Sequence, residues 1–173
     1  MKVKACVVLA CAVVASIMLP IGSASAAAGT VCKTEKGTIT FSPTLPKETS
    51  HQMVKATAYW KGTFSGCNNG VTGGTFTGSG KLGTVNCITT LGRTGTTNAK
   101  VTWKPSSAGI STLRFTGAPT ATGGTYTGVV TSGRFKGASV SLHEVWAKLL
   151  PPGGCATTGL KAINLKLGAS AHI

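Results

Sequence analysis

The segment Val54-Lys55-Ala56-Thr57-Ala58-Tyr59-Trp60-Lys61-Gly62-Thr63-Phe64 decides the fold class. Its even-numbered positions are apolar or small, whereas its odd-numbered positions carry lysine, threonine and tyrosine. Successive side chains of a strand point to opposite faces, so this alternation predicts a β-strand with one buried and one solvated face. Trp60 and Phe64 then face the core, and Tyr59 stands on the solvated face beside Lys61.

The same period of two recurs along the chain, separated by turn-forming glycine, proline and asparagine. Glycine occurs 24 times, whereas the helix formers glutamate, glutamine and methionine are scarce. The fold class is therefore all-β: a single antiparallel β-sandwich or a small eight-stranded barrel. We expect strands near residues 37–42, 52–65, 74–86, 96–104, 109–119, 124–132, 137–149 and 160–171.

One internal similarity accompanies these strands. The segment Thr72-Gly73-Gly74-Thr75-Phe76-Thr77-Gly78 returns 50 residues later as Thr122-Gly123-Gly124-Thr125-Tyr126-Thr127-Gly128. Two explanations stay open: related halves of one sheet, or two hairpins that use the same turn chemistry.

Residues 1–28 have the features of a cleaved secretory signal peptide. Lys2 and Lys4 precede a short apolar run that stops at Pro20, and small residues with an A-x-A pattern follow. The run is too short for a membrane helix, which needs about 20 apolar residues. We expect cleavage after Ala26 or Ala28, a single domain over 29–173, and a secreted protein that is extracellular or associated with the cell wall.

The charge of the chain is strongly positive. The whole sequence carries 17 lysine and arginine residues against three glutamates, and removal of Lys2 and Lys4 leaves a net charge of +12. Such a charge attracts an anionic cell-wall polymer or a membrane surface. The basic residues are dispersed, which argues against nucleic acid. A solvated surface without a specific partner stays open as an explanation. The expected basic face comprises Lys55, Lys61, Lys100, Lys104 and Arg114.

Four cysteines remain after the signal peptide, and export favours disulfide bonds. Four cysteines allow three pairings, which their spacing does not distinguish. Our working assignment pairs Cys32 with Cys155 and Cys67 with Cys87. No spacing of cysteine or histidine typical of a metal site occurs, so we expect no metal and no cofactor.

The sequence contains no catalytic motif, and we expect that the protein is not an enzyme. Of its three carboxylates, Glu35 and Glu48 fall in expected loops. Glu144 lies in a strand between Leu142 and Trp146, so regular alternation turns it toward the core. A strand bulge that returns it to solvent is the simpler interpretation, which we adopt here. His143 falls on the opposite face.

The three tryptophans, Trp60, Trp103 and Trp146, fall on faces assigned to the core, where large rings usually pack. Together with Glu144 they also form a candidate pocket for a small ligand. Packing is the simpler explanation of their position.

Two resemblances accompany these patterns. Val31-Cys32, Gly37-Thr38-Ile39-Thr40-Phe41-Ser42-Pro43, the cysteine at Cys67, Val101-Thr102-Trp103 and Cys155 resemble a group of uncharacterised small exported proteins of actinobacteria. This likeness implies an all-β, disulfide-bonded secreted domain and no activity. Gly74–Gly78, Val101–Lys104, Phe115–Gly117 and Val145-Trp146 resemble avidins, which implies an eight-stranded ligand-binding barrel, although the strand near Tyr126 departs from the avidin count.

Three functions follow as hypotheses. The first is a non-enzymatic basic β-domain that binds an anionic wall or surface partner. The second is a small-ligand-binding barrel with a tryptophan-lined pocket. The third is a cationic antimicrobial or toxin-like protein, which needs an exposed apolar patch beside its charge. The sequence does not determine the oligomeric state.

Overall fold

The computed structural model describes residues 28–146, 154–167 and 170–173. Its strands all belong to one sheet, and every pairing between them is antiparallel. The strands are β1 (Val31–Leu45), β2 (Val54–Cys67), β3 (Gly73–Val85), β4 (Gly95–Lys104), β5 (Ile110–Pro119), β6 (Gly123–Gly133), β7 (Ser139–Trp146), β8 (Leu160–Leu167) and the short β9 (Ala171–His172). The short helices are η1 (Glu48–Ser50), α1 (Cys87–Thr90), η2 (Ser106–Ala108) and α2 (Gly154–Thr157).

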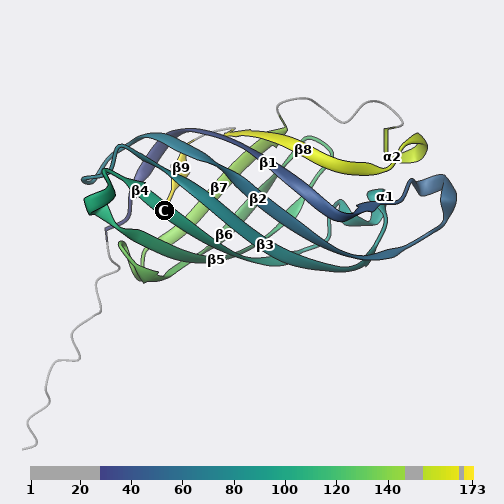
Figure 1. Cartoon of the computed structure of the whole chain (residues 1–173), viewed down its shortest axis with the longest axis horizontal. Helices are drawn as coiled ribbons and strands as arrows, with labels where there is room; N and C mark the ends of the chain where they lie inside the picture. The colour runs from purple at the N-terminus through teal and green to yellow at the C-terminus, as the bar shows by residue number, and fades with distance from the viewer. Residues whose placement is uncertain (1–27, 147–153, 168–169) are drawn as a thin grey trace, which may run out of the picture.

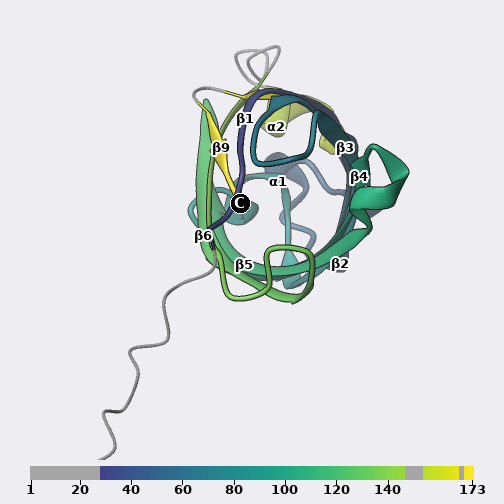
Figure 2. The same cartoon turned by 90° about the vertical axis from the view of Figure 1, so that its left-hand side faces the viewer.

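The sheet closes on itself. Strand β1 pairs with β2 on one side and with β8 on the other, while β2 to β8 pair in chain order. The result is an eight-stranded antiparallel barrel, drawn from the side in Figure 1 and as a ring in Figure 2. The predicted fold class is confirmed in its barrel form. The expected signal peptide lies almost wholly in residues 1–27, outside the described residues.

Strand β1 begins earlier than the sequence patterns predicted. It starts at Val31 rather than near residue 37, because its first residues pair with the end of β2 and with β9. Cys32 lies opposite Cys67, and Glu35 lies opposite Phe64. Our placement of Glu35 in a loop was therefore wrong, and its side chain points into the barrel, 2 % exposed.

The disulfide pairing differs from our assignment. Cys32 is bonded to Cys67 and Cys87 to Cys155, so both proposed pairs were wrong. The first bond joins neighbouring ends of β1 and β2, a proximity created by the register of the sheet. The second joins α1 to α2, which lie at the right-hand end of the barrel in Figure 1 and within its outline in Figure 2. Such bonds indicate an oxidising environment, as found outside the cell.

Inward-facing side chains fill the barrel. Trp103 is 1 % exposed, packs edge-on against Phe135 at 5.5 Å between ring centroids, and donates from Nε1 to Ser111 Oγ at 2.8 Å. Phe64 stacks at 6.5 Å from the same indole. The two similar segments begin β3 and β6, and each directs an aromatic residue inward, Phe76 and Tyr126 respectively. Most of the interior is thus a packed apolar core.

Candidate functional site

The barrel wall forks between β3 and β4. Among the described residues, the ladder between these strands ends at Ser79 opposite Asn98. Beyond this point β3 stays paired with β2 as far as Val85, and the start of β4 stays paired with β5. The two strands therefore present unpaired edges to each other, and the chain between them runs through α1 to Arg93 and Gly95.

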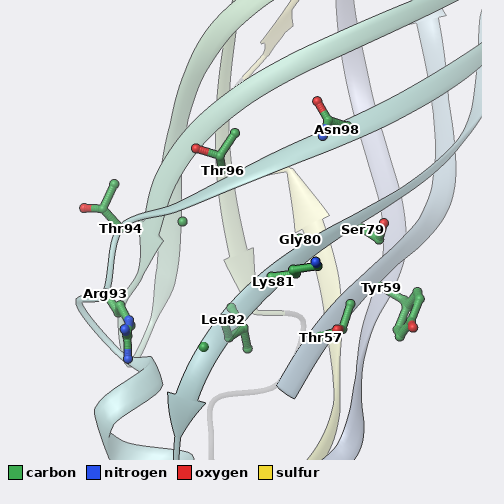
Figure 3. A pocket seen from close by; sticks show the side chains of 12 residues that line it. Thr57, Tyr59, Ser79, Gly80, Lys81, Leu82, Arg93, Thr94, Thr96 and Asn98 are labelled. Carbon is green, nitrogen blue, oxygen red and sulfur yellow. The ribbon is translucent and has the colours of Figure 1, made fainter. Parts of the chain in front are cut away.

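An open groove of about 760 Å³ occupies the outer side of this fork. Figure 3 shows Tyr59 and Thr57 on one strand, Ser79 and Lys81 on the next, and Thr94, Thr96, Asn98 and Arg93 on the opposite side. We call it the fork groove. It is defined by Thr57, Tyr59, Ser79, Gly80, Lys81, Leu82, Gly83, Arg93, Thr94, Gly95, Thr96 and Asn98.

The fork groove combines two cations with hydroxyl groups and one exposed aromatic ring. Arg93 spans the fork, because its Nη1 donates to the backbone oxygen of Thr84 on β3 at 3.1 Å. Lys81 is exposed, and Tyr59 exposes 47 % of its surface. This combination of ring face, hydroxyl groups and cations suits a ligand that carries both hydroxyl groups and negative charge. No side-chain carboxyl group lines the groove.

The five residues of the expected basic face are all exposed and lie on the outer side of β2, β4 and β5. Lys61 and Lys100 both lie opposite Thr77, on either side of β3. Arg114 lies opposite Asn98, which faces Ser79 and then Tyr59 in the same cross-strand row. Lys55 pairs with Thr84, and Lys104 pairs with Gly73 at the far end of β3. This face adjoins the fork groove through Tyr59 and Asn98.

The acidic side chains, in contrast to the basic ones, lie mostly inside the barrel. Glu144 is 2 % exposed inside the barrel, so our expectation of a bulge that exposes it was wrong. Its strand keeps a regular register with β6, with Glu144 opposite Gly124 and His143 opposite Thr125 on the outer side. Glu35 is also inside, which leaves Glu48 as the one exposed side-chain carboxyl group of the chain.

Glu35 and Glu144 meet within the barrel as an acid pair. Their carboxyl groups lie within hydrogen-bonding reach of each other. Burial raises the pKa of Glu35 to about 7, and the hydrogen bond to Glu144 opposes part of this rise. Burial raises the pKa of Glu144 well above its usual range, and the charge of Glu35 adds to that rise. The pair therefore retains a proton near neutral pH.

Two further polar groups near the pair lack hydrogen-bond partners among the described residues, namely the Nε1 of Trp60 and the hydroxyl of Tyr126. Burial and the charges of both acids raise the pKa of Tyr126. The tyrosine ring fits because Gly124 lacks a side chain: a Cβ there would approach the Tyr126 hydroxyl to 2.8 Å.

Two small internal cavities surround these groups. One, of about 10 Å³, is lined by Glu35, Glu144, Trp60 and aromatic rings that include Phe76 and Phe115. The second, of about 30 Å³, is lined by Trp60, Tyr126, Trp146, Leu82, Arg93 and Gly95 among others. The structure thus brings Trp60, Glu144 and Trp146 of the candidate pocket to adjoining cavities. Trp103 lines neither of them.

Glu35 and Tyr126 were missed as site residues. If the alternation seen at Ile39 and Phe41 is extended toward the N-terminus, Glu35 falls on the inward-facing side of the strand. The sequence around Tyr126 indicated only an ordinary aromatic residue of the core. The nearness of this residue to Glu144 follows from the register of β6 with β7, and its nearness to Glu35 from the order β6-β7-β8-β1 in the sheet.

Stability should depend on pH through this pair. Folding raises both carboxyl pKa values, so the folded state holds more protons and stability falls as pH rises from about 4.5 through about 7. The chain has only one exposed side-chain carboxyl group to mask the effect. Urea unfolding at about pH 5 and about pH 8 should differ by about 3 kcal/mol in the wild type.

The matched variants are Glu35→Gln/Glu144→Gln, which removes the pair, and Glu48→Gln, which removes the exposed carboxyl group. The first should flatten the pH dependence and the second should leave it unchanged. An equal dependence in all three proteins would show that the buried acids do not cause it.

No group of three or more histidine, cysteine or acidic residues suited to a metal ion occurs in the described part of the chain. Within that part, no helix has the length and apolar character needed to cross a bilayer. Comparison of the chain with protein-family models, with curated proteins and with solved structures found no match.

Proposed function

We propose that this chain is an exported, non-enzymatic binding protein that captures an anionic cell-wall polymer on its outer wall, with the fork groove as the centre of the contact. The observation that carries this proposal is the separation of charge across the wall. Every described lysine and arginine is exposed except the half-buried Arg134, whereas two of the three glutamates are enclosed. The outer surface therefore has almost no acidic group to oppose an anionic partner.

The fork groove supports a sugar-containing polymer in particular. Tyr59 offers an exposed ring where the groove meets the shallow surface beside it. Threonine, serine and asparagine side chains around it supply donors and acceptors for hydroxyl groups. The shallow surface continues past Ser79 and Asn98 to Lys100 and Thr112. An extended chain with regularly spaced anionic groups suits this strip better than a compact ligand does.

A matched pair of double variants tests the contact. Lys81→Ala/Lys100→Ala removes two cations along the strip, and Lys47→Ala/Lys161→Ala removes two exposed cations elsewhere. Binding to purified anionic wall polymer at low salt should weaken by about three- to ten-fold for the first variant and much less for the second. Wild-type binding should also weaken as salt approaches physiological strength, where screening acts beyond about 8 Å.

The aromatic contribution needs a separate control. Tyr59→Ala should weaken binding by about three- to ten-fold through loss of ring contact, whereas Ile110→Ala, at another exposed apolar position, should not. An equal loss of polymer binding in both double variants would mean that the polymer is attracted only by the overall charge and not by the strip. If the wild-type protein does not bind the wall polymer even at low salt, the proposal is wrong.

The membrane-damaging alternative has less support. Among the described residues, the exposed large apolar side chains come from the loop before β2, from β2 itself, and from α1, β5 and β6. They are Met53, Tyr59, Ile88, Ile110 and Val129. Release of dye from anionic liposomes would favour that alternative over capture of a polymer.

A further inference from the structure

The interior acid pair is the least expected feature of the barrel. Several buried polar atoms lack a hydrogen-bond partner among the described residues: both oxygens of Glu35, Oε2 of Glu144, Nε1 of Trp60 and the hydroxyl of Tyr126. The one polar contact of this group is that of the two acids with each other. Each such group costs about 1 to 3 kcal/mol when it is left without a partner. These unpartnered polar atoms lie close together, on side chains that are more than nine-tenths buried. Such a group of atoms indicates a site that a ligand completes.

Positive charge is what the pair lacks. Apart from the half-buried Arg134, the described lysine and arginine side chains are exposed. None of them lines the cavity of the acids, and Arg93 lines the second cavity together with Leu82 and Gly95. The cavity that holds the acids is lined instead by the rings of Trp60, Phe64, Phe76 and Phe115. Aromatic faces attract cations, and this attraction grows when water is excluded.

The size of the cavities limits the ligand. The cavity at the acids has a volume of about 10 Å³, and the adjoining one, on the other side of Trp60, has about 30 Å³. A single water needs roughly 10 to 15 Å³ on this measure. The first cavity accommodates a group the size of water, and the second accommodates a few carbon atoms beside Trp146.

We propose that the barrel interior binds a small primary amine, held as its alkylammonium ion by Glu35 and Glu144, with its short alkyl chain beside Trp60 and Trp146. The ammonium group donates to the carboxyl oxygens and lies against the surrounding rings. The Trp60 Nε1–H and the Tyr126 hydroxyl then donate to carboxylate oxygens that the ammonium ion has made anionic. None of the acidic residues of this site faces the outer wall, so amine binding can be tested on the protein alone, without the polymer.

The fork supplies the way in. Leu82, Arg93 and Gly95 line both the fork groove outside and the second cavity inside. The cations at this entrance repel an alkylammonium ion, so the amine passes as its uncharged base after release of a proton to water. Inside, the shared proton of the acid pair moves to the amine nitrogen, which gives an ammonium ion and a fully ionised pair. The balance of the whole process is uptake of one alkylammonium ion and release of one proton.

Titration of the full mature chain with n-butylammonium chloride tests this site. The probe is the indole N–H signals in the nitrogen–proton spectrum, assigned with Trp60→Phe. Trp103 Nε1 donates to Ser111 and Trp146 Nε1 donates to the backbone of Thr120, so only the Trp60 N–H is free to gain a partner. We expect its signal to shift saturably with butylammonium, and not with sodium butyrate or with sodium chloride at equal concentration. Butanol should bind at least about ten-fold more weakly.

Variants and pH complete the test. Glu35→Gln and Glu144→Gln should each weaken butylammonium binding by about ten-fold or more, whereas Glu48→Gln should not. Tyr126 and the two acids are the titratable groups that face the site, with Arg93 at the second cavity, so affinity should rise from about pH 6 to about pH 8 as the pair loses its shared proton. Equal binding of butanol and butylammonium, preferential binding of butyrate, or no saturable shift of Trp60 would each overturn the proposal.

Discussion

Replacement of both Cys87 and Cys155 by alanine should lower the free energy of unfolding by about 4 kcal/mol. The bond joins residues 68 positions apart, so its loss releases a long segment of the unfolded chain that contains β4 to β7. It also separates α1 from α2 at the end of the barrel. Urea unfolding under non-reducing conditions measures the change, and a decrease of less than about 1 kcal/mol would contradict the loop-closure explanation.

The other bond provides the matched comparison. Cys32 and Cys67 are 35 positions apart, and halving a loop changes the closure term by only about 0.6 kcal/mol. Cys32→Ala/Cys67→Ala should therefore cost nearly as much. The two loops do not overlap in the sequence, so the costs should add in the fourfold variant. Peptide mapping of the oxidised protein checks the pairing itself.

Trp103→Ala should lower the free energy of unfolding by about 4 kcal/mol. The indole is fully enclosed between Phe64 and Phe135, and its removal leaves a cavity that strands fixed in a closed ring cannot collapse to fill. The hydrogen bond to Ser111, which itself donates to the backbone oxygen of Arg134, is lost with it. Thermal and urea unfolding followed by circular dichroism measure the loss.

Trp103→Phe separates packing from hydrogen bonding. It retains most of the ring and loses the N–H donor, so it should cost about 1 to 2 kcal/mol. Tyr59→Ala, on the solvated face, should cost less than either variant. A similar cost for Trp103→Ala and Tyr59→Ala would mean that the interior is not packed as described.

The sequence was sufficient for the strands and for their faces because alternation is a local property. In β2, Ala56, Ala58, Trp60 and Phe64 are buried, and Lys55, Tyr59 and Lys61 are exposed, as the period of two predicted. The choice between sandwich and barrel depends instead on whether β1 reaches β8. That pairing is made between residues far apart in the chain and leaves no local pattern.

The same limit explains the errors at the site. Cysteine pairing follows from the register of β1 with β2 and from the meeting of two short helices, neither of which spacing encodes. Glu144 was assigned to solvent because an unpaired buried acid is costly. The assignment failed because a second acid, Glu35, comes from the other side of β8 to share its proton. A general rule about single residues does not anticipate such a pair.

The pairing of β1 with β8 also determines when the molecule can finish folding. Thr38 on β1 donates to Asn164 on β8, a partner 126 positions later in the chain. Hairpins from β2 onward can form as they emerge from the ribosome, yet the ring stays open until β8 has been synthesised. Topologies that rely on such distant contacts fold slowly. The barrel can therefore close only after the seven preceding strands have been made.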